Sequence, residues 1–115
     1  MSRQRRSNKY PENFITDMFS GCDEEIAMFL NIPDVEKRLE YSIYRFLNLR
    51  EIDILNRYYR DMETLKSISE SQGVTTERIR QIRCKALRKL RRVNGGYFVL
   101  KNGIEKYEER FHDKV

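Results

Sequence analysis

The segment from residue 76 to residue 92 carries polar and charged side chains at the spacing of one helix face. At about 100° per residue, Glu77, Gln81, Cys84, Lys85 and Arg88 fall on the same side. A carboxylate can accept a hydrogen bond from cytosine N4, a glutamine amide can pair with adenine, and an arginine can reach guanine or phosphate. This combination predicts a helix that reads base edges in duplex DNA. The alternative is an ordinary solvated face.

The opposite side of the same segment is apolar and predicts a face that packs on the protein. This side comprises Ile79, Ile82, Ala86, Leu87 and Leu90. Arg83 falls inside the apolar arc and therefore needs either an acidic partner or a route to solvent.

Positive charge is concentrated in one block of the chain. The net charge is +5, yet residues 64–92 carry nine basic and two acidic side chains, whereas residues 10–63 carry six basic and twelve acidic. Such a block is typical of an element that binds a polyanion, because protein surfaces normally intersperse both signs. A solvated basic helix face is the alternative that charge alone leaves open.

Two capped helices with a glycine between them are predicted to position this face. Thr64 can cap a short helix over residues 65–71, and Gly73 supplies the positive-φ residue that ends it. Thr75 can cap the next helix, which we expect to run from residue 76 to about residue 92. A helix, a short turn and a longer helix form a helix-turn-helix, in which the second helix enters the major groove.

Shorter helices are predicted upstream. Residues 13–20 and 23–30 are helical candidates separated by Gly21, and residues 1–9 are expected to form a disordered basic arm. A clearer helix begins after Pro33-Asp34. Its apolar stripe comprises Val35, Leu39, Ile43 and Phe46.

A further helix is predicted to begin at Asn48, which can form a capping box with Glu51. Its inner stripe is expected to comprise Leu49, Ile52, Leu55 and Tyr59. Ile54 and Tyr58 point elsewhere, so this helix needs a second packing partner. We expect the N-terminal helices to be that partner, and an outward surface for another protein is the alternative.

The tail after Asn94-Gly95-Gly96 has two interpretations. Residues 97–100 resemble a strand, and Asn102-Gly103 suits a tight hairpin turn. We nevertheless favour a C-terminal helix from about Ile104, because apolar residues follow helical spacing there. These residues are Ile104, Tyr107, Phe111 and Val115.

Composition excludes several functional classes. In 115 residues, 36% of them charged, no stretch approaches the roughly 18 apolar residues of a membrane span. Cys22 and Cys84 have neither disulfide nor zinc-site spacing, His112 is the only histidine, and no phosphate-binding glycine loop or nucleophile motif occurs. We expect a cytoplasmic, non-enzymatic protein with no catalytic residue, cofactor, metal or small-molecule substrate.

The expected fold class is all-α, a small helical bundle with a C-terminal helix-turn-helix and a short tail. The expected organisation is a basic arm at residues 1–9, short helices at 10–33, the helix-turn-helix domain at 34–92 and an appendage at 93–115.

A family resemblance rests on three segments. Residues 74–91 read VTTERIRQIRCKALRKLR, Thr64-Leu65 precede them, and residues 47–55 read LNLREIDIL. These segments resemble region 4 of sigma-70-type sigma factors, a helix-turn-helix that binds the −35 promoter element, and the resemblance covers about residues 34–92. It implies docking on the β-subunit flap of RNA polymerase as well as binding to double-stranded DNA.

The resemblance also assigns roles by position. It implies base contacts by Thr76, Glu77 and Gln81. It implies backbone contacts by Thr64, Arg78, Arg80 and Lys85. With the capping residue and the remaining cation of the polar face included, the expected DNA-binding set is Thr64, Thr75, Thr76, Glu77, Arg78, Arg80, Gln81, Lys85 and Arg88.

The chain departs from the family in three places. Thr76 stands where primary factors use an arginine to read guanine, Gln72 replaces an apolar residue of the turn, and the loop before Thr64 is shorter. No segment resembles region 2, which recognises the −10 element and melts DNA. We therefore expect something other than a complete sigma factor.

Three functions remain open at this point. The first is a sequence-specific, double-stranded-DNA-binding transcription regulator that acts with RNA polymerase at promoters. The second is a homodimeric helix-turn-helix repressor or activator, whose partner is a second copy of itself. The third is a protein-interaction adaptor that binds RNA polymerase or a sigma factor through its basic helix.

Overall fold

The computed structural model describes residues 9–20 and 22–111, so the expected basic arm, apart from Lys9, and Val115 lie outside the described residues. Within them the fold is all-α without a strand, as predicted. The helices are α1 (Glu12–Met18), α2 (Asp23–Leu30), α3 (Val35–Phe46), α4 (Leu49–Leu55), η1 (Asn56–Arg60), α5 (Leu65–Gln72), α6 (Thr76–Leu90), α7 (Gly96–Asn102) and α8 (Ile104–Phe111). The short η1 is a π-helix that continues α4. No described helix is both long and apolar enough to cross a membrane.

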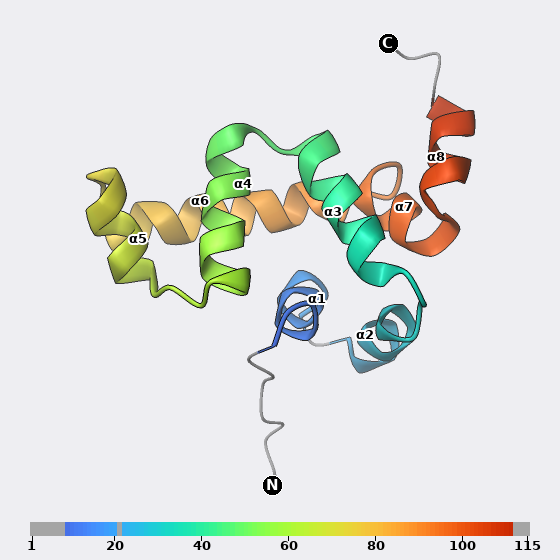
Figure 1. The fold of residues 1–115 in the computed structure, drawn as a ribbon, viewed down its shortest axis with the longest axis horizontal. Coiled ribbons are helices and arrows are strands. Elements are labelled where there is room, and N and C mark those ends of the chain that lie inside the picture. Colours follow the sequence, from blue (N-terminus) through green and yellow to red (C-terminus); the bar gives the residue numbers. More distant parts are fainter. Residues whose placement is uncertain (1–8, 21, 112–115) are drawn as a thin grey trace, which may run out of the picture.

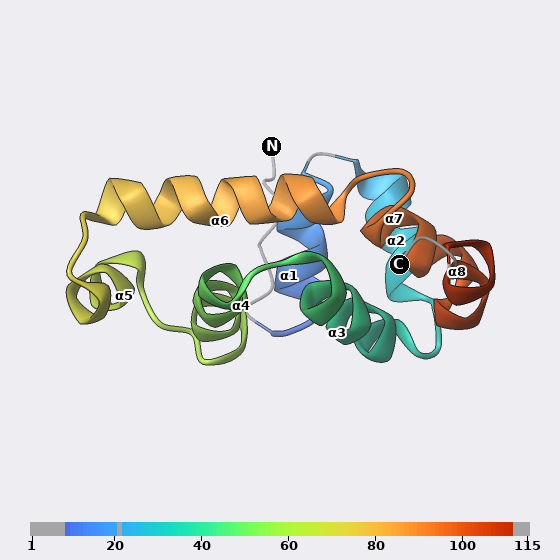
Figure 2. The same cartoon turned by 90° about the horizontal axis from the view of Figure 1, so that it is seen from above.

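The longest helix, α6, runs along one side of a flat molecule that measures 42 × 41 × 19 Å. Figure 1 shows α5 beside the start of α6 and α7 and α8 beyond its end. In Figure 2, α3, α4 and α5 lie across from α6, so that α6 has one side toward the other helices and one side away from them.

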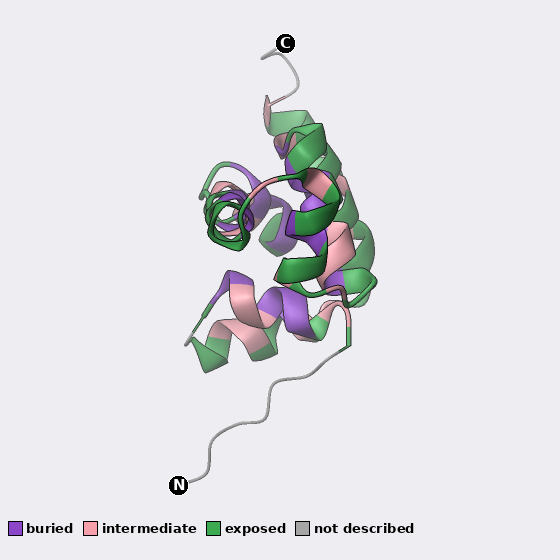
Figure 3. Ribbon diagram, turned by 90° about the vertical axis from the view of Figure 1, so that its left-hand side faces the viewer, coloured by how far each residue is buried: buried purple, intermediate pink, exposed green. Residues whose placement is uncertain are grey.

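The main core joins α6 to the N-terminal helices. Phe14, Ile15 and Met18 of α1 are completely buried, in one apolar cluster with Leu39 of α3 and Leu90 of α6. The same cluster also includes residues of α2, α4, η1 and α7. Figure 3 shows the outcome, with buried residues turned inward and exposed residues over the outer turns. The N-terminal helices are therefore structural parts of this core.

A second, smaller core holds the helix-turn-helix together, and it corrects one expectation. It consists of Ile54 of α4, Ile68 of α5, and Ile79 and Ile82 of α6, with Tyr58 packed against both cores. We expected Ile54 to meet the N-terminal helices or an external protein, and both expectations were wrong. α4 carries two apolar faces because it packs between the main core and the helix-turn-helix.

One other local prediction was wrong, and so was the less favoured interpretation of the tail. Leu49 is 84% exposed rather than part of the inner stripe. It is the first residue of α4, and a side chain there points back past the helix N-terminus instead of onto a neighbour. Residues 97–100 form part of α7 and no strand. Val99 and Leu100 are fully buried, and packing against α3 and α6 overrides their β-propensity.

A close approach fixes the junction between α6 and α7. Gly96 begins α7 beside the backbone of Leu90, where a Cβ at Gly96 would collide with the Leu90 carbonyl. Only glycine allows the chain to turn this tightly after α6. The helix predicted from Ile104 is confirmed as α8, and Gly103 at a φ of 101° separates it from α7.

Candidate nucleic-acid interface

Three predicted capping features set the orientation of the helix-turn-helix. Thr64 Oγ1 accepts from the Ser67 N–H at 3.0 Å, and Thr75 Oγ1 accepts from the Arg78 N–H at 3.0 Å. Gly73 ends α5 in the left-handed conformation at a φ of 69°. Because each cap satisfies backbone groups that the helix ends leave open, the turn between α5 and α6 is locally defined.

The two faces of α6 divide as the spacing predicts. All five residues of the apolar face are buried: Ile79, Ile82, Ala86, Leu87 and Leu90. All nine residues of the expected DNA-binding set are exposed: Thr64, Thr75, Thr76, Glu77, Arg78, Arg80, Gln81, Lys85 and Arg88. Eight of these nine lie on or directly before α6, and Thr64 lies apart, at the start of α5.

The first two turns of α6 carry a hydrogen-bonded group of side chains. Arg80 binds Glu77 through two hydrogen bonds, with Nε–Oε1 at 3.0 Å and Nη2–Oε2 at 2.6 Å. Gln81 Nε2 also donates to Glu77 Oε2, at 3.3 Å. The hydrogen bond from Arg80 holds the pKa of Glu77 below its ordinary value, so this carboxylate stays ionised. Glu77 thereby restrains the two side chains beside it.

A groove of about 260 Å³, here called the basic groove, lies between the start of α4 and the exposed side of α6. Four cations line it: Arg50, Arg78, Lys85 and Arg88. The groove is also lined by Asn48, Glu51, Gln81 and Ile82. A concave surface with this charge attracts phosphate, because field lines are focused between low-dielectric walls.

Arg50 is a groove residue that sequence reasoning missed. It is the second residue of α4, and only the packing of α4 on α6 brings it near Arg78 and Lys85. Its Nε donates to Gln72 Oε1 at 3.0 Å, while Gln72 Nε2 donates to Asp53 Oδ2 at 3.0 Å. Gln72, a polar departure from the family pattern, therefore ties α5 to α4 and orients Arg50.

Three other cations of the basic block interact with residues elsewhere in the protein. Arg83 lies 3.8 Å from Asp17 and its guanidinium stacks 4.7 Å above the ring of Tyr58, which answers its need for an acidic partner. Lys89 pairs with Glu51 at 2.9 Å. Arg91 donates to the Met18 carbonyl at 3.2 Å. These cations hold α6 in place and contribute little to its exposed face.

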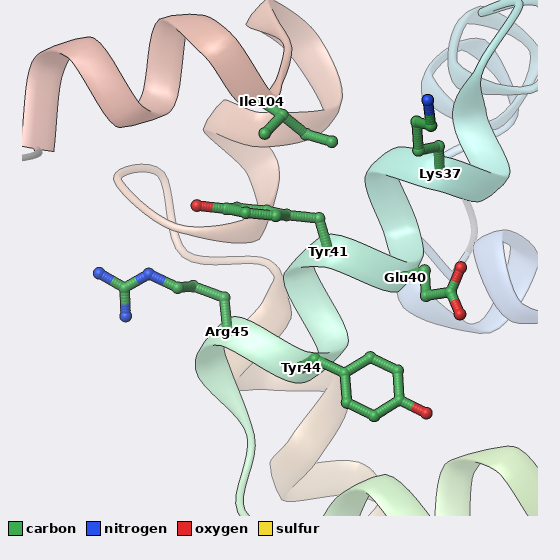
Figure 4. A pocket seen from close by; sticks show the side chains of 6 residues that line it. All are labelled: Lys37, Glu40, Tyr41, Tyr44, Arg45 and Ile104. Carbon is green, nitrogen blue, oxygen red and sulfur yellow. The ribbon is translucent and has the colours of Figure 1, made fainter.

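A second, open groove lies on the outer face of α3, close to the start of α8 (Figure 4). Its lining mixes tyrosines with both signs of charge: Lys37, Glu40, Tyr41, Tyr44, Arg45 and Ile104. This mixture distinguishes it from the basic groove at α6. Among the described residues, no cluster of histidine, cysteine and acidic side chains could hold a metal ion.

The fold and the exposed face of α6 define a helix-turn-helix protein. Residues 46–92 match the family described as sigma-70, region 4. This part of the chain is therefore a sigma-70 region 4 domain, and the match contains α4, η1, α5 and α6.

Curated relatives are RNA polymerase sigma factors. The chain is 43% identical to sigma factor SigA of Nostoc sp. over 86 residues, which cover 71% of this chain and 21% of that protein. It is 43% identical to SigA1 of Synechococcus elongatus over 76 residues, or 63% of this chain and 18% of that protein. It is 39% identical to RpoD of Neisseria gonorrhoeae over 83 residues, or 69% of this chain and 12% of that protein. The chain thus spans about a fifth or less of these relatives. No solved structure gives a significant match.

Proposed function

We propose that this protein is a sequence-specific, double-stranded-DNA-binding regulator of transcription that acts with RNA polymerase at promoters. The observation that carries the proposal is the exposed face of α6, on which Arg78, Gln81, Lys85 and Arg88 line one basic groove while the opposite face is buried. In a helix-turn-helix, this is the helix that enters the major groove. The region 4 domain and the sigma-factor relatives support the role in transcription. A cytoplasmic location follows from that role.

The partnership with polymerase has a physical reason. A single helix-turn-helix module buries only about 600–1,000 Å² of its surface on DNA, and part of its affinity is electrostatic and independent of sequence. One copy alone therefore discriminates poorly at physiological salt. We expect RNA polymerase, or a second copy, to supply the missing contact area and to raise specific occupancy at least tenfold, or about 1.4 kcal/mol.

Footprinting with and without RNA polymerase, on a promoter-containing duplex that the full chain selects, tests this function. We expect a footprint that strengthens at least tenfold with polymerase. Lys85→Glu should abolish it, whereas Lys106→Glu, the same charge reversal on exposed α8, should preserve it. A footprint of unchanged strength and extent, from a chain that sedimentation shows to be a monomer, would refute the need for a partner. Equal loss in both variants would refute the assignment to α6.

A further inference from the structure

The hydroxyl of Thr76 lies beside a buried serine of α5. Ser69 of α5 is only 4% exposed, and its Oγ donates to the Lys66 carbonyl at 2.8 Å. The same Oγ lies 3.3 Å from Thr76 Oγ1. Either hydroxyl can be the donor in this contact; while the single proton of Ser69 is on the Lys66 carbonyl, the donor is Thr76.

In that arrangement the single proton of Thr76 is directed to Ser69 and is not offered to a base. Guanine presents only acceptors, N7 and O6, in the major groove, and a side chain without a donor cannot read it. The Oγ1 atom is turned toward buried Ser69, while Thr76 itself is exposed. The other group of this side chain is the methyl, and a threonine methyl can make apolar contact with the C5 methyl of thymine.

We propose that Thr76, positioned by Ser69, selects thymine and rejects guanine at the base that faces the first turn of α6. The inference rests on the proposed function, because it requires α6 to enter the major groove. Thr76 is the first residue of α6, and the N-terminal residues of a recognition helix are those that contact base edges.

The first experiment locates the base. The full chain and its Thr76→Arg variant each select from a library of randomised duplexes in the presence of RNA polymerase. We expect the two preferred sites to differ at one position, with thymine for the natural chain and guanine for Thr76→Arg. Guanine at that position for the natural chain overturns the inference.

The second experiment isolates the methyl group. Replacement of that thymine by deoxyuridine should weaken binding about fourfold, the value of one buried methyl. Thr76→Val keeps the methyl and should keep the discrimination between thymine and deoxyuridine, whereas Thr76→Ser should lose it. Ser69→Ala removes the acceptor, so the Thr76 hydroxyl becomes available as a donor and guanine should be tolerated better. A purely structural role for Ser69 would lower stability without changing base preference.

Failure of the inference is distinguishable from failure of the proposed function. A chain that binds its selected duplex but has equal affinity for thymine and deoxyuridine overturns the role of Thr76 alone. An unchanged base preference in Ser69→Ala overturns the positioning role of Ser69. A chain that binds no duplex at low salt, alone or with RNA polymerase, overturns the proposed function and this inference together.

Discussion

Glu77 accepts hydrogen bonds from Arg80 and from Gln81, so these three side chains form one hydrogen-bonded group on the exposed face of α6. A glutamine donates two amide protons, and Gln81 uses one of them on Glu77. Its second proton and its carbonyl oxygen remain for a paired contact to adenine. Lys85, one turn further on, lines the basic groove and suits phosphate.

These different roles predict different mutant phenotypes. Gln81→Ala should change the preferred base at one position of the site, by about 1–3 kcal/mol. Lys85→Ala should weaken binding to all sequences alike. It should also reduce the slope of log affinity against log salt concentration by about one. Fluorescence anisotropy titrations against every single-base variant measure both. An unchanged preference in Gln81→Ala would show that Gln81 reads no base.

Tyr59 predicts a specific dependence of stability on pH. Burial, and then the hydrogen bond of 2.7 Å to Asp17, raises the pKa of Tyr59 far above its ordinary value of 10.0. Below pH 10.0, the tyrosine is protonated in both the folded and the unfolded chain, and its contribution to the free energy of unfolding is fully present. Above that pH only the unfolded chain ionises, so the free energy of unfolding falls as pH rises.

Urea unfolding of the natural chain and of Tyr59→Phe measures this effect. The phenylalanine variant cannot ionise at this position, so the stability difference between the two proteins should narrow by about 1.4 kcal/mol between pH 8 and one unit above the ordinary tyrosine pKa. Other groups titrate equally in both proteins and cancel. A constant difference would show that Tyr59 ionises in the folded chain at its ordinary pKa.

At the scale of elements, α6 is held by contacts at both ends and along its inner side. α5 packs on its first turns, Lys89 pairs with Glu51 of α4, and α7 begins against its last turn. Glu51 has a second role in the predicted capping box, where its Oε1 accepts a hydrogen bond from the Asn48 N–H. The cap of α4 and the position of α6 therefore depend on one carboxylate.

Two glycines at element junctions allow a matched comparison. Gly96→Ala places a Cβ against the backbone of Leu90, which cannot move cheaply, and should cost about 3 kcal/mol. Gly73→Ala meets no atom within 4 Å and carries only the strain of a φ of 69°, so it should cost about 1–2 kcal/mol. Urea unfolding measures both variants. Equal stabilities would mean that α7 can shift away from α6.

At the scale of the whole molecule, the basic block is divided between structure and surface. Arg83, Lys89 and Arg91 are used within the protein, and Arg80 is paired with Glu77. The remaining cations of the block are exposed: Lys66, Arg78, Lys85, Arg88 and Arg92. Arg50 joins them in the groove, although it lies in the acidic half of the sequence.

This division predicts the salt dependence of duplex binding. With roughly five or six phosphate contacts, the logarithm of affinity should fall with the logarithm of salt concentration at a slope of about −5. Titrations at several salt concentrations measure the slope. A slope near zero would exclude binding through phosphates, and a slope near −9 would mean that the protein-bound cations also contact DNA.

The sequence alone determined the features that depend on neighbours in the chain. Caps at Asn48, Thr64 and Thr75, the left-handed Gly73 and the two faces of α6 follow from spacings of three or four residues, and the structure confirms them. The all-α class and the region 4 resemblance follow from the same local patterns. Local hydrogen bonds and helical periodicity are short-range, and a sequence expresses them directly.

Only the tertiary structure decided which helix meets which. The burial of Ile54, the helical state of residues 97–100, the place of Arg50 and the Asp17 partner of Arg83 all depend on residues far apart in the chain. An apolar residue on a helix predicts burial but not the element against which it packs. A charged residue likewise does not predict which residue will be its partner. The contact between the Thr76 hydroxyl and Ser69 is the clearest case, because it depends on how α5 crosses α6.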